Sequence, residues 1–91
     1  MHPTDPQELI TRVGRRIAEL RSAKGMTQAD FAEAMGCSVQ YVGLLERGKQ
    51  NLTLEKMAEV GNVLGATVED LLRRPKRGSL EIKKGRPSPQ R

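Results

Sequence analysis

Gln28 and residues 38–51 carry the side chains whose types could do chemistry in this 91-residue chain. The carboxamide of Gln40 can both donate and accept, as pairing with N6 and N7 of adenine requires. Val39 and Leu44 can offer only apolar contact, which suits the methyl group of thymine. If a helix carries them into a DNA groove, we expect these three side chains to face the base edges of a duplex with A·T-leaning sequence. The polar side chains expected to position the phosphates are Gln28, Ser38, Lys49, Gln50 and Asn51.

Two short helices joined by a tight turn are expected to position these side chains. Thr27 can cap a helix over 28–35, and Gly36 can take the positive φ at which the chain leaves that helix. Ser38 can then cap a second helix over 39–47. Short helices that cross at a glycine-containing turn are typical of the helix-turn-helix motif, whose second helix lies in the major groove.

The segment resembles the Cro/cI-type (XRE-like) helix-turn-helix regulators over about residues 9–73. That resemblance implies an all-α fold, a compact five-helix lambda-repressor-like domain that binds double-stranded DNA to regulate transcription. It also implies that Arg21 pairs with Glu46, because these residues match the family's arginine and glutamate positions. The residues that match the family pattern are Thr27, Gln28, Phe31, Ala32, Gly36, Ser38, Val42, Leu45, Glu46 and Gly48.

Three further helices should complete a domain over residues 5–74. Each follows a residue that can cap a helix N-terminus, and Pro75 stops the last. Nothing in residues 5–74 indicates a strand or a second domain, whereas the alternation of polar and apolar residues from Ser79 to Lys83 leaves open a short strand that pairs with its counterpart in a dimer. The expected helices cover 6–23, 54–64 and 68–73, and the expected inward residues are Ile10, Val13, Ile17 and Leu20 in the first, and Met57, Ala58 and Leu64 in the second.

The last helix predicts a homodimer. Val68, Leu71 and Leu72 are more apolar surface than one small core needs from a terminal helix, so we expect them at a dimer interface. One recognition helix covers only a few base pairs, whereas two related by a two-fold axis can read half-sites one helical turn apart.

The basic charge is concentrated in a Gly/Pro-rich tail over residues 75–91. Residues 1–72 hold eight Lys and Arg against ten Asp and Glu, whereas residues 73–91 hold eight against one. The run from Lys84 to Pro87 looks like the core of an AT-hook, so we expect Lys83, Lys84 and Arg86 to contact the minor groove or phosphates. A solvated tail that only aids solubility is the alternative.

Composition weighs against other classes of protein. Cys37 is the single cysteine and His2 the single histidine, so an internal disulfide or a Cys/His metal site is not expected. No spacing brings together a base, a nucleophile and an oxyanion donor, so we expect neither catalysis nor a cofactor. The longest apolar runs are far below the roughly 20 residues that span a bilayer. We expect a cytoplasmic protein without membrane contact.

The sequence is compatible with two narrower interpretations. The run from Ser38 to Met57 looks most like the small controller proteins of restriction–modification systems. Those proteins often carry arginine where this chain has Val39 and Gln50, which favours an ordinary regulator. A rival class is the antitoxin of a toxin–antitoxin pair, with an exposed Leu44 and the tail covering a partner toxin.

Overall fold

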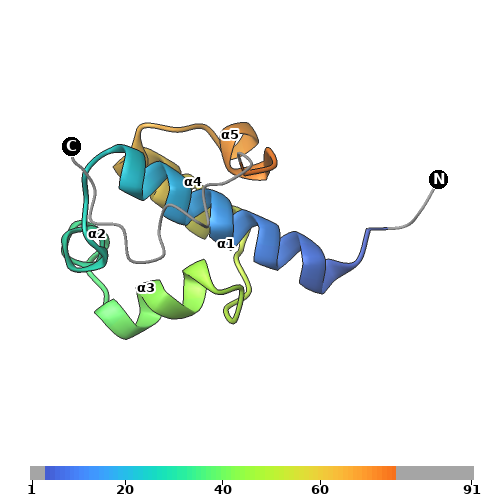
Figure 1. Ribbon diagram of the computed structural model, residues 1–91, viewed down its shortest axis with the longest axis horizontal. Helices are drawn as coiled ribbons and strands as arrows, with labels where there is room; N and C mark the ends of the chain where they lie inside the picture. The colour runs from blue at the N-terminus through green and yellow to red at the C-terminus, as the bar shows by residue number, and fades with distance from the viewer. Residues whose placement is uncertain (1–3, 76–91) are drawn as a thin grey trace.

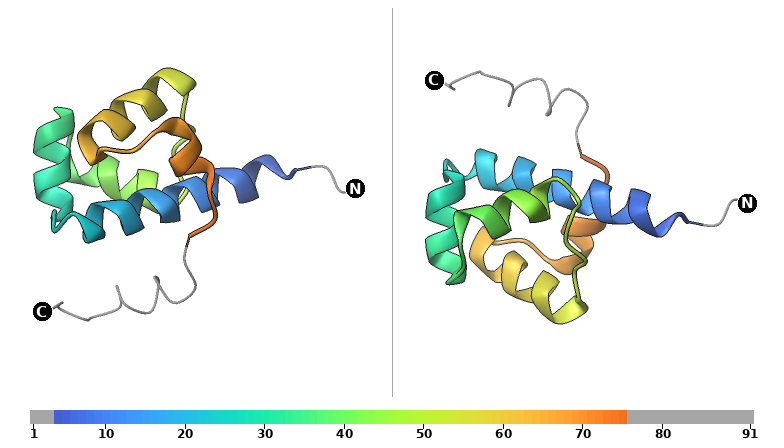
Figure 2. Two further views of the ribbon diagram at one scale, coloured as in Figure 1. Left: turned by 90° about the horizontal axis from the view of Figure 1, so that it is seen from above. Right: turned by 90° about the horizontal axis from the view of Figure 1, so that it is seen from below.

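The computed structural model describes residues 4–75, and within that range the regular secondary structure is α-helix, without a strand. The all-α, five-helix fold expected from the sequence is confirmed. α1 is the longest helix, and α3 and α5 lie on opposite sides of it (Figure 1). In both views of Figure 2, α2 crosses one end of the group formed by α1, α3 and α4. The helices are α1 (Pro6–Ala23), α2 (Gln28–Met35), α3 (Val39–Glu46), α4 (Leu54–Leu64) and α5 (Val68–Leu72).

Each helix begins where a local side chain can cap it. Asp5 accepts from the backbone N–H of Gln7, for example, and Thr53 accepts from that of Lys56 at 3.0 Å. A cap oxygen satisfies one of the backbone donors that a helix start leaves without a partner. The starts expected from the sequence match the structure, whereas α3 and α5 each end one residue earlier than expected. No helix among residues 4–75 is long and apolar enough to cross a membrane.

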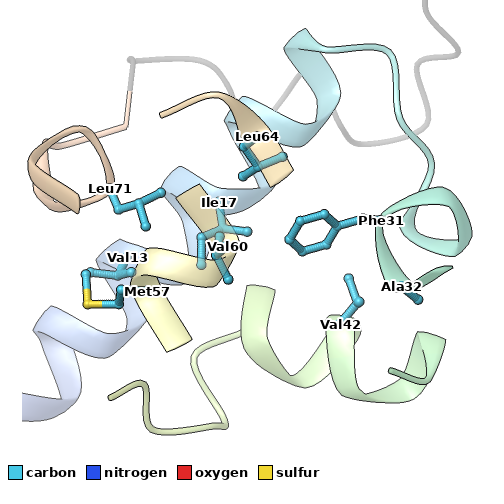
Figure 3. Close-up of a cluster of buried hydrophobic side chains, with 9 residues drawn as sticks. All are labelled: Val13, Ile17, Phe31, Ala32, Val42, Met57, Val60, Leu64 and Leu71. Atoms are coloured by element: carbon cyan, nitrogen blue, oxygen red, sulfur yellow. The ribbon is translucent and has the colours of Figure 1, made fainter. Parts of the chain in front are cut away.

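The core lies between the five helices and takes side chains from all of them (Figure 3). Phe31 of α2 is fully buried and points toward Ile17 and Val42. Burying a side chain of this size stabilises the fold by about 1.5–3 kcal/mol. The core cluster consists of Val13, Ile17, Phe31, Ala32, Val42, Met57, Val60, Leu64 and Leu71.

The inward faces of α1 and α4 differ in two places from those expected. Ala58 is exposed and Val60 is fully buried, so the prediction for Ala58 was wrong. The buried stripe of α4 is Met57, Val60, Gly61 and Leu64, the i, i+3, i+4, i+7 spacing of one helix face. In α1, Leu9 packs against the core, whereas Ile10 is half-buried and lies outside the core cluster.

Two arginines of α1 hold the C-terminal end of α5. Arg16 donates from Nε to the backbone carbonyl of Asp70 at 2.9 Å, and Arg12 donates from Nη2 to that of Leu72 at 3.1 Å. A five-residue helix leaves most of its carbonyls without a partner inside the helix. Cationic donors at this end also oppose the negative end of the helix dipole. Both contacts therefore stabilise α5 against α1.

Candidate nucleic-acid interface

The turn between α2 and α3 is closed by backbone hydrogen bonds. Gly36 has φ 72° and ψ 35°, a left-handed conformation that glycine adopts without steric cost. The N–H of Cys37 donates to the carbonyl of Ala32 at 2.9 Å, and that of Gly36 donates to Glu33 at 3.2 Å. This pair of bonds ends α2 and fixes the direction in which the chain enters α3.

α3 has a buried face and an open face. Val42 and Leu45 are fully buried, so they anchor the helix to the core. Val39 is 44% exposed, and Gln40 is exposed beside it. Leu44 is half-buried, so it offers less surface than the sequence suggested. The open face therefore presents one apolar and one amide side chain near the N-terminal end of the helix.

Ser38 has its hydroxyl at the N-terminus of α3. The Oγ atom accepts from the N–H of Tyr41 at 3.0 Å, as a helix cap does. The residue is exposed, and a hydroxyl that accepts one bond can still donate its own proton. Ser38 can thus cap the helix and contact an anion at the same time.

The ion pair expected between Arg21 and Glu46 is present, and it joins α1 to the end of α3. Arg21 donates from Nε to Oε2 of Glu46 at 2.6 Å and from Nη2 to Oε1 at 3.2 Å. A third guanidinium nitrogen donates to the carbonyl of Met26 at 2.7 Å. The side chains are only 11% and 7% exposed, so the pair is largely shielded from water.

Gln28 joins this network, which the sequence did not predict. Its Nε2 donates to Oε1 of Glu46 at 2.9 Å. The carboxylate of Glu46 therefore receives hydrogen bonds from α1 and α2 together. One amide proton of Gln28 is used in holding α3, and only the second remains for a phosphate.

The loop after α3 holds the other polar side chains expected near phosphates. Lys49 and Asn51 are exposed, and Gln50 is half-buried. The loop is tied to α1 because the Nε2 of Gln7 donates to the carbonyl of Gly48 at 2.9 Å. A fixed loop can present Lys49 and Asn51 in a constant position relative to α3.

The structure adds Arg47 to the open face of α3. Its Nη1 lies 3.1 Å from the position that a Cβ atom of Gly43 would occupy. The long side chain thus lies back along the helix over Gly43. Val39, Gly43 and Arg47 follow one another at intervals of four residues, so they lie on the same side of the helix. The signal in the sequence was that spacing, together with a glycine that leaves room for a side chain.

The expected dimer interface needs one correction. Leu71 is fully buried in the core of a single chain, so its side chain is not available to a second copy. Val68 is half-buried against the core, while Leu72 is 38% exposed. Leu54, at the start of α4, is 75% exposed and was not predicted. The tail residues Lys83, Lys84 and Arg86 lie outside the described residues.

Comparisons with known proteins agree with this geometry. The regulator DdrOP3 of Deinococcus deserti is 42% identical over 57 residues, which are 63% of this chain and 44% of that protein. This chain thus matches less than half of its length. The uncharacterised HTH-type regulator y4dJ of Sinorhizobium fredii is 38% identical over 60 residues, 66% of this chain and 78% of that protein.

The restriction–modification controller protein C.AhdI of Aeromonas hydrophila has a similar structure, with a TM-score of 0.69 and 32% identity. The similarity covers 75% of this chain and 99% of the controller. The helix-turn-helix family model (HTH_3) matches residues 17–71, which are more than half of the chain. The chain belongs to this helix-turn-helix family.

Proposed function

We propose that this protein is a transcriptional regulator that binds a specific double-stranded DNA sequence as a homodimer, with α3 in the major groove. The observation that carries the proposal is the open face of α3, where Val39 and Gln40 are exposed on a helix fixed by Val42, Leu45 and Glu46. Relatives named as HTH-type transcriptional regulators support it.

In the proposed complex, contacts divide into base readout and phosphate positioning. Gln40 pairs with an adenine and Val39 contacts a thymine methyl group. Leu44 is half-buried, so only the exposed part of its side chain can contact a base. Ser38, Lys49 and Asn51 contact phosphates, with Gln50 and the second amide proton of Gln28 beside them. In the tail, Lys83, Lys84 and Arg86 add phosphate or minor-groove contacts.

The homodimer follows from the small footprint of α3. An eight-residue helix reaches only a few base pairs, and a two-fold pair reads two half-sites. We place the interface at the exposed Leu54 and Leu72, with half-buried Val68 between the core and the surface. The antitoxin alternative lacks the exposed Leu44 on which it depended, because that side chain is half-buried.

The test measures the affinity of Gln40→Ala for a duplex that the wild-type protein binds and for the single-base-pair variants of that duplex. Loss of the amide should cost about 1–3 kcal/mol and relax the preference at one base pair. Asn62→Ala, which truncates an exposed amide on α4, is the matched control and should leave binding unchanged. Equal loss on every duplex would make Gln40 a backbone contact, and unchanged binding would show that Gln40 contacts neither a base nor the backbone.

A further inference from the structure

Arg47 is placed to act at the centre of the open face of α3. Outside Gly43, its two chain neighbours and the backbone of the helix, the three heavy atoms nearest to the position of a Cβ on Gly43 all belong to the guanidinium of Arg47: Nη1 at 3.1 Å, Cζ at 3.8 Å and Nη2 at 3.9 Å. Gly43 is buried even though its side-chain direction meets the arginine and not the core. The guanidinium therefore covers the middle of the helix and does not extend beyond its C-terminal end.

The charge of Arg47 has no evident structural use. It is the only Lys or Arg between Lys24 and Lys49. Within residues 4–75, its side chain has no hydrogen bond or ion pair, in contrast to Arg21, whose guanidinium is occupied by Glu46. Arg47 is exposed, and its guanidinium has five N–H donors that are free to bind a partner outside the described residues.

We infer that Arg47 reads a guanine, donating to its O6 and N7 atoms in the major groove. This inference rests on the proposed function, since it assigns one more contact of the same face. Arginine forms this bidentate pair more often than any other specific base contact. The half-site should then contain a G·C pair beside the A·T pair read by Gln40, and not be A·T-leaning throughout.

The direction of the side chain favours a base over a phosphate. Ser38 and Lys49 lie beyond the two ends of α3, where a helix seated in the groove meets the DNA backbone. Arg47 begins at the C-terminal end but returns over Gly43, in the row that also contains Val39. Its donors thus lie between the two ends, on the part of the helix that faces base edges.

Gly43 is the positioning residue for this contact. A methyl group there would lie 3.1 Å from Nη1, tighter than an ordinary contact, so the guanidinium would have to shift. Alanine is the better helix former, so Gly43→Ala should not weaken the fold. This variant therefore moves the arginine while leaving α3 intact.

The experiment measures affinity for a selected half-site and for its three variants at each base pair. Arg47→Ala should lower affinity about 5- to 150-fold on sites with one particular G·C pair, and much less on sites that lack it. Lys49→Ala is the matched control and should weaken binding to all sites alike, with the slope of log affinity against log salt reduced by about 0.9. Gly43→Ala should reduce the same G·C preference, with an equal or higher unfolding midpoint.

Four outcomes would overturn the inference in different ways. Arg47→Ala with the uniform loss expected of Lys49→Ala would make Arg47 a phosphate contact. Full G·C preference in Gly43→Ala would show that packing over Gly43 does not aim the guanidinium. A wild-type chain that prefers no sequence would overturn the proposed function itself, whereas sequence preference without this G·C pair would overturn only the role of Arg47.

Discussion

Arg21 and Glu46 form a bidentate ion pair between α1 and the C-terminal end of α3, with nitrogen–oxygen distances of 2.6 and 3.2 Å. Gln28 of α2 donates to the same carboxylate. The buried carboxylate of Glu46 thus fixes the position of α3 relative to both α1 and α2. The position of the exposed face of α3 therefore depends on this group as well as on the buried Val42 and Leu45.

Removing one partner of this pair should be costly. Glu46→Ala leaves the guanidinium of Arg21, only 11% exposed, without its counter-ion, and should lower the free energy of unfolding by about 3–5 kcal/mol. Combining Arg21→Met with Glu46→Leu should restore part of that loss, since no unpaired charge remains. Urea unfolding of the single and double variants measures the coupling.

The matched control is the surface pair of Lys56 and Glu59, whose side chains are 33% and 50% exposed. Glu59→Ala should cost less than about 1 kcal/mol, because water screens exposed ion pairs. Equal effects at Glu46 and Glu59 would contradict a structural role for the buried network.

Gly14 should tolerate no larger side chain. A Cβ atom there would approach the backbone carbonyl oxygen of Leu45 more closely than real Cβ atoms come, and would lie 2.9 Å from that of Glu46. Because backbone atoms cannot turn away, Gly14→Ala should destabilise the domain by about 1–3 kcal/mol. Thermal unfolding checks this, with Gly43→Ala as the control that meets only a flexible side-chain tip. An unchanged midpoint would show that α1 and α3 are less closely packed.

Neighbouring leucines at the end of α5 should behave differently. Leu71→Asp places a carboxylate at a fully buried position, which costs several kcal/mol, so circular dichroism should show loss of helix. Leu72→Asp changes a side chain that is 38% exposed and should leave the fold intact while weakening the proposed dimer in sedimentation velocity. A folded Leu71→Asp chain, or an unchanged dimer with Leu72→Asp, would contradict these assignments.

Two helix starts should make stability depend on acid pH. The pKa of Asp30 is lowered from 3.8 by hydrogen bonds from the backbone N–H and the hydroxyl of Thr27, and Thr67 lowers that of Asp70 in the same way. A lowered native pKa means that the stabilisation is complete above the unfolded value and is lost as pH falls through the native one. Unfolding midpoints of Asp30→Asn and Asp70→Asn should therefore fall less than those of the wild type below about pH 4. Parallel curves for wild type and variants would contradict this linkage.

Sequence reasoning recovered what depends on local interactions. The cap at Thr27 and the positive φ at Gly36 each follow from a few neighbouring residues, so the starts of the helices and the turn could be predicted. Val39 and Gln40 could be placed on the open face because Val42 and Leu45 fill the opposite one.

Packing between helices set the rest. Leu71 resembled a surface residue because α5 is short, yet α1 and α4 enclose it. Gln28 was predicted to contact a phosphate because the sequence does not show its hydrogen bond to Glu46, which lies 18 positions away. Arg47 was not predicted because its place on the open face of α3 depends on the direction that its side chain takes over Gly43. The sequence does not specify this direction.

Selection of bound duplexes from a random pool by the full chain tests the central claim most directly. If two copies read DNA with α3, the enriched sequences should form an inverted repeat with half-site centres about 10 base pairs, one helical turn, apart. Each half-site should combine an A·T pair for Gln40 with a G·C pair for Arg47. A pool that shows no enrichment, or that converges on a single unrepeated site, would contradict a homodimeric regulator reading DNA through this face.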